Sequence, residues 1–209
     1  MGTTSHPPRR PEPVPITKGD RTRQAVLDAA VVRFAREGYR GTSVADVCRD
    51  AGLSTTASYP YFSSKEAIFV AAVDEDVAGL IDDAVSLFLL DVDPDQWGGR
   101  MMAALLTHLK EHPLAERILR GLEPEFTMRL LHIPALQELR KAVTELIATQ
   151  QMEGRVRPDI EAGETASGMV VIVISLLMAS VQTGADAVGW GQVAGDVESV
   201  LSAATRPSS

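Results

Sequence analysis

The chain has 209 residues, of which 45% are hydrophobic and 23% are charged, so it is long enough to bury a core and has an ordinary globular composition. Its one cysteine, Cys48, excludes an internal disulfide framework and suits a reducing cytosol. The first twenty residues contain five prolines and no apolar stretch, so we expect no secretory signal and a cytoplasmic protein.

Charge is divided unevenly along the chain. The net charge of −8 argues against a nucleic-acid partner, because phosphate binding needs positive charge. However, residues 1–70 hold ten Lys and Arg against seven Asp and Glu, whereas the remainder holds ten against twenty-one. A basic first part can meet DNA while the acidic remainder is repelled from it.

The N-terminal region predicts an arm followed by a helix. Residues 1–19 are rich in proline and show no hydrophobic periodicity, so we expect a disordered arm. Its basic residues would either add phosphate contacts or form a solvated tail. From Arg21 to Glu37 an apolar stripe predicts a first helix, with Gly38 as its C-terminal stop.

Two short segments follow. A second helix begins at Thr42 or Ser43, either of which can cap it, and ends at Gly52. A third segment, from Ser54 to Phe62, is short and polar with an aromatic end. The sequence from Ser63 to Glu66 then matches a capping box and opens a fourth helix that continues to about residue 90.

The rest of the chain predicts further helices separated by prolines and glycines, with no strand and no repeat. These helices are expected at Asp95–Glu111, Leu114–Leu122, Glu125–Gln151, Asp159–Thr183 and Gln192–Ala204. The predicted fold class is therefore all-α, with about nine helices in total.

The segment from Thr42 to Phe62 has the properties of a helix-turn-helix. Two short helices that cross closely need a small residue at their contact, and Cys48 lies four residues before the turn glycine. Gly52 adopts at little steric cost the positive φ that a tight turn needs. We therefore interpret Cys48 as a small core residue rather than a redox switch. The polar segment after Gly52 is the one expected in the major groove.

In this region the chain resembles the TetR family of bacterial regulators. The resemblance runs from about Arg23 to Val70 and rests on FAREGYRGTSVADVCRDAGLS followed by YPYFSSKEAIF. It implies a three-helix DNA-binding domain at 20–66 and a larger helical domain for ligand binding and dimerisation at 67–209. It also implies a repressor that binds a palindromic operator in double-stranded DNA as a homodimer, is released by a small molecule and uses no cofactor.

The resemblance further implies which residues contact DNA. Residues at the start of the second helix would bind a phosphate, those after Gly52 would face the groove, and the lysine at the head of the fourth helix would pair with a phosphate. The expected DNA-binding residues are Arg23, Arg40, Thr42, Ser43, Ser54, Thr55, Thr56, Ala57, Tyr59, Tyr61 and Lys65.

Several alternatives remain open in the head. The alternative role for Tyr59 is packing within the head. The alternative for Lys65 is a solvated side chain, although a cation at a helix start opposes the helix dipole. Ser58 stands where the family has a larger apolar residue, and Pro60 lacks the N–H that a helix needs. We therefore expect a recognition helix that is kinked or begins late. A helical small-molecule-binding or adaptor protein with a non-functional helix-turn-helix is the alternative function.

The run from Met169 to Val181 is apolar on nearly every face. At 13 residues it is too short to span a bilayer, so we expect a buried helix and no membrane partner. A second subunit is the expected cover, and a central core helix of a monomer is the alternative. The expected interface residues are Val170, Ile174, Leu177, Val181 and Val197.

Methionine and aromatic residues of the body predict an apolar cavity, because such side chains adapt to the shape of a ligand. The expected lining residues, each of which also fits a plain core, are Trp97, Met101, Met102, Leu105, Phe126 and Met128.

Metal binding and catalysis are not indicated. His108 and His112 have the spacing of a metal pair, Glu111 is nearby and His132 is farther away. One pair without a clear third ligand predicts satisfied or solvated histidines rather than a metal site. The sequence holds no recognisable nucleophile, phosphate-binding or zinc-protease motif, so we predict that the protein is not an enzyme.

Overall fold

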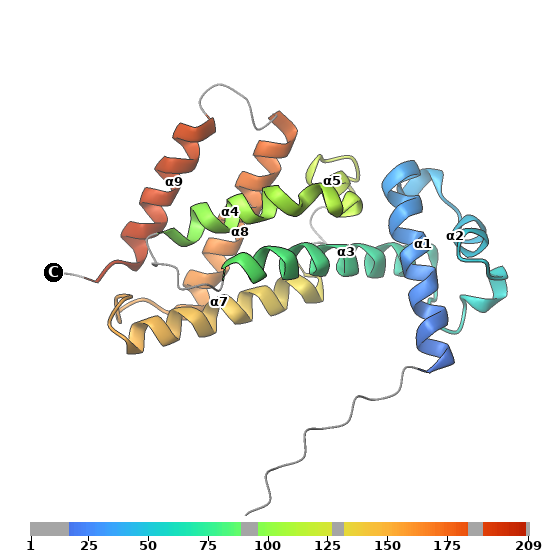
Figure 1. Ribbon diagram of the computed structural model, residues 1–209, viewed down its shortest axis with the longest axis horizontal. Coiled ribbons are helices and arrows are strands. Elements are labelled where there is room, and N and C mark those ends of the chain that lie inside the picture. Colours follow the sequence, from blue (N-terminus) through green and yellow to red (C-terminus); the bar gives the residue numbers. More distant parts are fainter. Residues whose placement is uncertain (1–16, 89–95, 127–131, 184–189, 208–209) are drawn as a thin grey trace, which may run out of the picture.

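The computed structural model describes residues 17–88, 96–126, 132–183 and 190–207. Within these ranges the chain forms eight α-helices and two short 3-10 helices and contains no strand, which confirms the predicted all-α class. Figure 1 shows a small head, formed by the first helices, attached to a larger bundle of helices. The predicted arm up to residue 16 and the predicted cavity residue Met128 lie outside the described ranges.

The first helix, α1 (Lys18–Gly41), begins earlier than predicted because a capping box fixes its start. Thr17 accepts the backbone N–H of Asp20 at 3.1 Å, and the Asp20 carboxylate accepts the backbone N–H of Thr17 at 2.9 Å. Lys18 and Gly19 therefore belong to the helix rather than to the arm. Gly38, the predicted stop, interrupts the helix with a φ of +75°.

The helix-turn-helix follows α1. Helix α2 (Val44–Asp50) packs on α1, and Arg33 of α1 binds both carboxylate oxygens of Asp50, at 2.7 and 2.8 Å. Gly52 makes the turn with a φ of +69°, as predicted. Cys48 is fully buried, which confirms its interpretation as a small core residue. The 3-10 helix η1 (Thr55–Ala57) comes next.

Helix α3 (Lys65–Phe88) belongs to both parts of the molecule. Its first half carries Ile68, Phe69 and Val73 into the core of the head, where they meet the apolar stripe of α1. Its second half carries Leu80 and Ala84 into the core of the bundle. In Figure 1 this one helix runs from beside α1 into the middle of the bundle.

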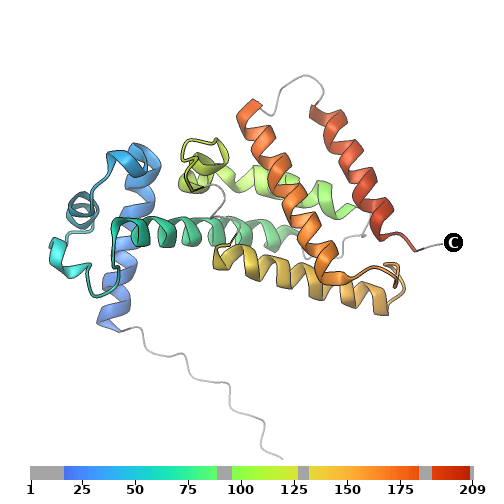
Figure 2. The ribbon, with the colours of Figure 1, turned by 180° about the vertical axis from the view of Figure 1, so that it is seen from behind.

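The body consists of the remaining helices. Their bounds are α4 (Trp97–His108), η3 (Leu109–Glu111), α5 (Pro113–Leu119), α7 (Pro134–Met152), α8 (Ala162–Thr183) and α9 (Trp190–Thr205). Helices α4 and α7 flank α3, α8 crosses the bundle on its far side, and α9 lies at the end away from the head, as the two opposite views show (Figures 1 and 2).

Proline sets two helix starts that the sequence analysis placed differently. The helix expected from Glu125 begins at Pro134, and the helix expected from Leu114 begins at Pro113. In both cases proline occupies the first helical position, where its missing N–H has no partner to lose and its fixed φ suits the helix. The helix expected to continue to Glu111 tightens into η3 after His108.

Helix α8 is more exposed than its composition suggests. It has 22 residues and a mean hydropathy of 1.9 over its most apolar window, of which 22% is buried within the chain. Its length and composition meet the criteria for a membrane span, which core helices of soluble proteins also meet. Part of its apolar surface, including Val171, is uncovered within the single chain.

Candidate nucleic-acid interface and ligand cavity

Ser43 is the residue that caps α2. Its hydroxyl accepts the N–H of Asp46 at 3.2 Å, while the Asp46 carboxylate accepts the Ser43 hydroxyl at 2.6 Å and the Ser43 N–H at 3.1 Å. The bond from the Ser43 hydroxyl, followed by that from its N–H, lowers the pKa of Asp46 to about 2. The carboxylate therefore accepts the Ser43 N–H and hydroxyl, the groups of Ser43 that were predicted to bind a phosphate.

Thr42 faces inward instead. It is 3% exposed, and its hydroxyl donates to the carbonyl oxygen of Gly38 at 2.9 Å. Its side chain thus supports the end of α1, on the inner side of the head.

The recognition segment, residues 54–62, is a series of single turns rather than a regular helix. Ala57 donates its N–H to the Ser54 carbonyl at 2.9 Å, and Tyr61 and Phe62 both donate to the Ser58 carbonyl at 3.0 Å. Pro60 has no N–H for the carbonyl four residues earlier, so the helix cannot continue through it. The expected disturbance at Pro60 is confirmed, but the helix ends early instead of beginning late.

The middle and the end of the recognition segment are anchored differently. Ser58 is 1% exposed and its hydroxyl donates to the Thr55 carbonyl at 2.9 Å, so a local hydrogen bond serves where the family has an apolar side chain. Phe62 is buried in the core of the head, with the Arg23 guanidinium 5.5 Å above its ring.

Most of the predicted contact residues lie on the surface of the head. Tyr59 keeps 61% of its surface exposed, which argues against the alternative of a packing residue. Arg40 is exposed and pairs with Glu125 at 3.2 Å. Thr55, Ala57 and Lys65 are half-buried. The other exposed members of the predicted set are Arg23, Ser43, Ser54, Thr56 and Tyr61.

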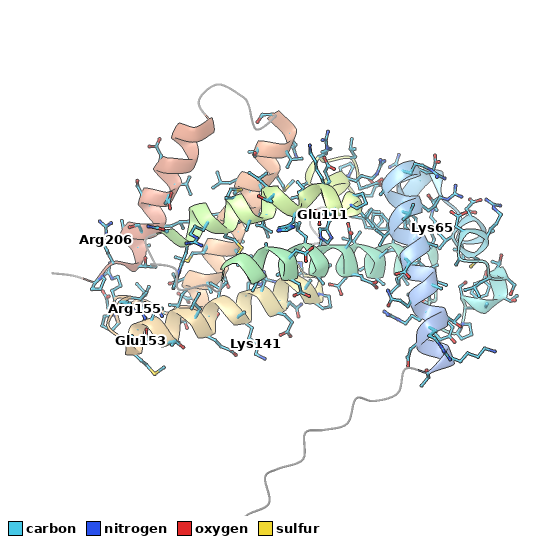
Figure 3. The ribbon with its side chains drawn as sticks, in the orientation of Figure 1. Lys65, Glu111, Lys141, Glu153, Arg155 and Arg206 are labelled. Atoms are coloured by element: carbon cyan, nitrogen blue, oxygen red, sulfur yellow. The ribbon has the colours of Figure 1, made fainter. Side chains whose placement is uncertain are left out.

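Lys65 lies at the junction of α1 and α3 (Figure 3). Its ammonium donates to the carbonyl oxygens of Tyr39 at 2.9 Å and Thr42 at 3.1 Å, and it lies 4.2 Å from the centre of the Tyr39 ring. It therefore stabilises the carbonyl end of α1. An ammonium has three N–H groups, and these two bonds use two of them.

The body contains an apolar cavity of about 330 Å³ between α3, α4, α7 and α8. Val77, Leu80 and Ile81 of α3 form one wall. The polar side chains among its lining residues are Ser175, Glu198 and Ser202. A cavity of this composition suits an apolar molecule with a small polar group.

The structure divides the predicted cavity residues. Trp97, Met101 and Leu105 line the cavity. Met102 faces a smaller cavity of about 200 Å³ between α4, α8 and α9. Phe126 lies in an aromatic cluster at the head, 4.4 Å from Phe69 between ring centres.

The predicted interface residues are also divided. Val170 and Leu177 are 5% and 3% exposed and line the cavity, so they have little surface left for a partner. Ile174 and Val181 are half-buried. Val197 faces the smaller cavity. The exposed apolar residues of this region are Val171 on α8, at 45%, and Val200 on α9, at 63%.

A buried polar contact joins the head to the body. Glu123 is 3% exposed, and its Oε1 accepts the Tyr39 N–H at 3.0 Å and the Arg117 Nε–H at 2.7 Å. Gly38 leaves room there because it has no Cβ, and a Cβ at this position would overlap the Arg117 guanidinium. Sequence reasoning missed this contact, since nothing in the spacing of Arg117 and Glu123 relates them to Gly38.

Sequence reasoning also missed most of the cavity wall. Leu136, Val143 and Leu146 of α7 line it, yet their helical spacing indicates only an ordinary core face. A cavity depends on the distance between packed helices, and the residue pattern does not encode that distance.

Comparisons with known proteins agree with the arrangement. Residues 26–72 match the family described as bacterial regulatory proteins, tetR family. The transcriptional repressor NicS of Pseudomonas putida is 31% identical over 147 residues, which span 70% of this chain but 65% of NicS. The repressor AcnR of Corynebacterium diphtheriae is 30% identical over 141 residues, which span 66% of this chain and 70% of AcnR.

A solved structure shows the same fold. FadR from Bacillus subtilis, in complex with stearoyl-CoA, superposes with a TM-score of 0.63 over 87% of this chain and 98% of that chain. The two sequences are 14% identical, so the likeness concerns the fold alone.

Proposed function

Because the chain belongs to the TetR family of bacterial regulatory proteins, we propose that it is a transcriptional repressor that binds a palindromic operator as a homodimer and is released by a small apolar molecule. One observation supports the whole proposal. Helix α3 starts next to the exposed recognition segment and also forms a wall of the apolar cavity. A molecule bound in the cavity therefore contacts the helix that carries the head.

In this proposal the recognition segment reads the major groove. Thr56 and Tyr59 are the exposed side chains most favourably placed for base or backbone contacts. Lys65 contributes its remaining N–H to a phosphate while holding α1. Ser43 contacts a phosphate only when the Asp46 side chain has rotated away from it, because the Asp46 carboxylate repels a phosphate.

The effector is proposed to be largely apolar. The cavity wall offers apolar side chains over most of its surface, with the Glu198 carboxylate at the α9 side. A molecule with a hydrocarbon body and one neutral or cationic hydrogen-bond donor satisfies both features. FadR from Bacillus subtilis was solved in complex with stearoyl-CoA, a molecule that contains a long hydrocarbon chain.

The dimer is proposed to form through α8 and α9. A recognition segment this short reads too few base pairs alone, so two copies must be held about one DNA turn apart. The exposed valines Val171 and Val200 give α8 and α9 an apolar surface for a second copy. We also propose that the protein acts in the cytoplasm, without a cofactor and without enzymatic activity.

The test is selection of DNA bound by the purified chain from a random pool, followed by a search for compounds that release it. The proposal expects enrichment of an inverted repeat and release by apolar compounds. Enrichment of no sequence would refute operator binding, and indifference to every compound that occupies the cavity would refute the effector role.

A further inference from the structure

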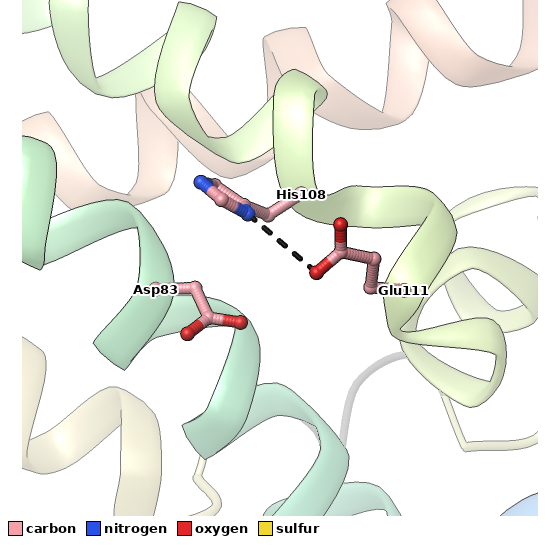
Figure 4. Close-up of side chains that lie close together, drawn as sticks. All are labelled: Asp83, His108 and Glu111. Atoms are coloured by element: carbon pink, nitrogen blue, oxygen red, sulfur yellow. Dashed lines mark ion pairs between the residues drawn. The ribbon is translucent and has the colours of Figure 1, made fainter.

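A cluster of histidine and carboxylate side chains lies where α3 meets the end of α4. Asp83 comes from α3, His108 is the last residue of α4, and Glu111 ends η3. One ligand-type atom from each of the three lies within 4.8 Å of the other two. Figure 4 shows Asp83 across from His108 and Glu111. The residue pattern offers no clear third ligand in this region, and the fold supplies Asp83 from a different helix.

His108 is the unusual member of the cluster. Both of its ring nitrogens are buried, and neither has a hydrogen-bond partner within the described part of the chain. Nδ1 lies 3.8 Å from Glu111 Oε2, which is beyond hydrogen-bond distance. Burying an imidazole nitrogen without a partner costs free energy, so a group that binds it would stabilise the fold.

His112 positions one member of the cluster, Asp83, through a hydrogen bond. Its Nε2 lies 3.1 Å from Asp83 Oδ2, and its Nδ1 lies 3.4 Å from Asp76 Oδ1. Asp76 is itself fixed, because its Oδ2 accepts two backbone N–H groups at the start of α5. A Cβ on Gly79 would lie 2.7 Å from His112 Cε1, so glycine is needed for the ring to lie against α3. Carboxylates that bind metals are often oriented by such a second hydrogen bond.

We propose that Asp83, His108 and Glu111 bind one divalent transition-metal cation, for which Zn²⁺ is a suitable probe. One imidazole nitrogen and two carboxylate oxygens suit Zn²⁺, whereas Mg²⁺ and Ca²⁺ prefer oxygen ligands alone. Three protein ligands leave a fourth position for water. A cation also offsets the repulsion between the carboxylates of Asp83 and Glu111, which meet here.

The bound cation adds a link between two elements that the hydrogen bonds of His112 and Asp76 already join. It connects α3, which carries the head and lines the cavity, to the turn between α4 and α5. Metal binding therefore stabilises one position of α3 relative to α4.

The test is a Zn²⁺ titration of the full chain, free of affinity tags and stripped with a chelator, in competition with a chromophoric chelator. Wild-type protein is expected to bind one Zn²⁺ per chain. His108→Gln and Glu111→Gln are each expected to weaken this binding at least tenfold, since changes around metal sites typically cost about 10–100-fold. His132→Gln, a change at an exposed histidine elsewhere in the body, is the matched control and is expected to bind like wild type.

A second measurement guards against misfolding. Zn²⁺ is expected to raise the thermal midpoint of wild type and His132→Gln but not that of His108→Gln or Glu111→Gln. Glu111 is exposed, so its isosteric change leaves the fold intact. Absence of binding by wild type, or equal binding by wild type and both ligand variants, overturns the proposal.

Discussion

At the scale of single residues, polar side chains stabilise the ends of α1. Thr17 and Asp20 cap its start, while Lys65 and Glu123 bind backbone groups near its end. Helix ends leave backbone groups without intrahelical partners, and these side chains supply partners. Because Glu123 and Lys65 come from other elements, the same bonds also fix the head to the rest of the chain.

Glu123→Gln is expected to lower the free energy of unfolding. The change removes the charge that pairs with Arg117 inside the head–body junction, and hydrogen bonds to charged groups contribute about 1.5–3 kcal/mol. Glu153→Gln is the matched control, because the Glu153–Arg155 pair is about half exposed, and it should cost no more than about 0.5 kcal/mol. Urea unfolding at one protein concentration measures both. Equal effects would contradict the role of Glu123.

Lys65→Ala is expected to have two effects. Loss of the bonds to two carbonyl groups should destabilise the head by about 1–2 kcal/mol. Loss of a phosphate contact should weaken binding to all DNA sequences alike and reduce the salt slope by about 1. Lys141→Ala, at an exposed lysine of α7, changes the net charge equally and should alter neither quantity. If Lys65→Ala lowered the stability of the head but left the salt slope of DNA binding unchanged, Lys65 would have a structural role and no phosphate contact.

Some of these residue roles were readable from the sequence and others were not. Gly52 and Cys48 were predicted correctly, because a tight turn and a close helix contact restrict the residue type on their own. Glu123 was not predicted, because its partners Tyr39 and Arg117 meet it only through packing. Asp83 was missed for the same reason, since it lies on a different helix from the histidines it approaches.

At the scale of elements, α3 is the central feature because it belongs to both cores. Its apolar side chains around Phe69 pack into the core of the head, and those around Leu80 line the cavity. The sequence predicted this helix and its length well, since a helical repeat persists through it. The recognition segment was predicted less well. Pro60 is compatible with a helix that is kinked or that begins late, and only the hydrogen bonds to the Ser58 carbonyl show that the helix ends early.

Met101→Trp is expected to prevent effector binding without loss of DNA binding. Met101 lines the cavity, and the larger ring would occupy space that an apolar molecule needs. Displacement of an apolar fluorescent dye by straight-chain alcohols would measure the change, with an expected loss of at least about tenfold. Met152→Trp is the control, because Met152 on α7 is 82% exposed. Equal affinities in the two variants would locate the effector site elsewhere.

At the scale of the whole molecule, charge and exposure are arranged for two kinds of contact. The first 70 residues carry a positive balance on a chain whose net charge is −8, which favours contact of the head with DNA. At the opposite end, α8 and α9 expose valines that a single copy leaves uncovered. The sequence predicted a dimer through this helix pair, and of the residues that it predicted on α8, Val170 and Leu177 are buried while Ile174 and Val181 are half-buried.

Val171→Glu is expected to dissociate the dimer. Val171 is 45% exposed on α8, so the change should leave the monomer folded while burying an unpaired charge at the contact. Val32→Glu, on an exposed valine of α1, is the control and should leave the assembly unchanged. Sedimentation of both variants measures the outcome, and a Val171→Glu protein that sediments as the wild-type dimer would contradict an interface at this surface.

The most direct measurement is binding of the purified chain to its selected inverted repeat and to a scrambled duplex of equal length, each at several salt concentrations. We predict that the repeat binds at least about 10³-fold more tightly than the scrambled duplex. We also predict that both affinities fall steeply with salt and that an apolar compound which fills the cavity removes the preference. Equal affinity for the two duplexes, independent of salt, would contradict the account.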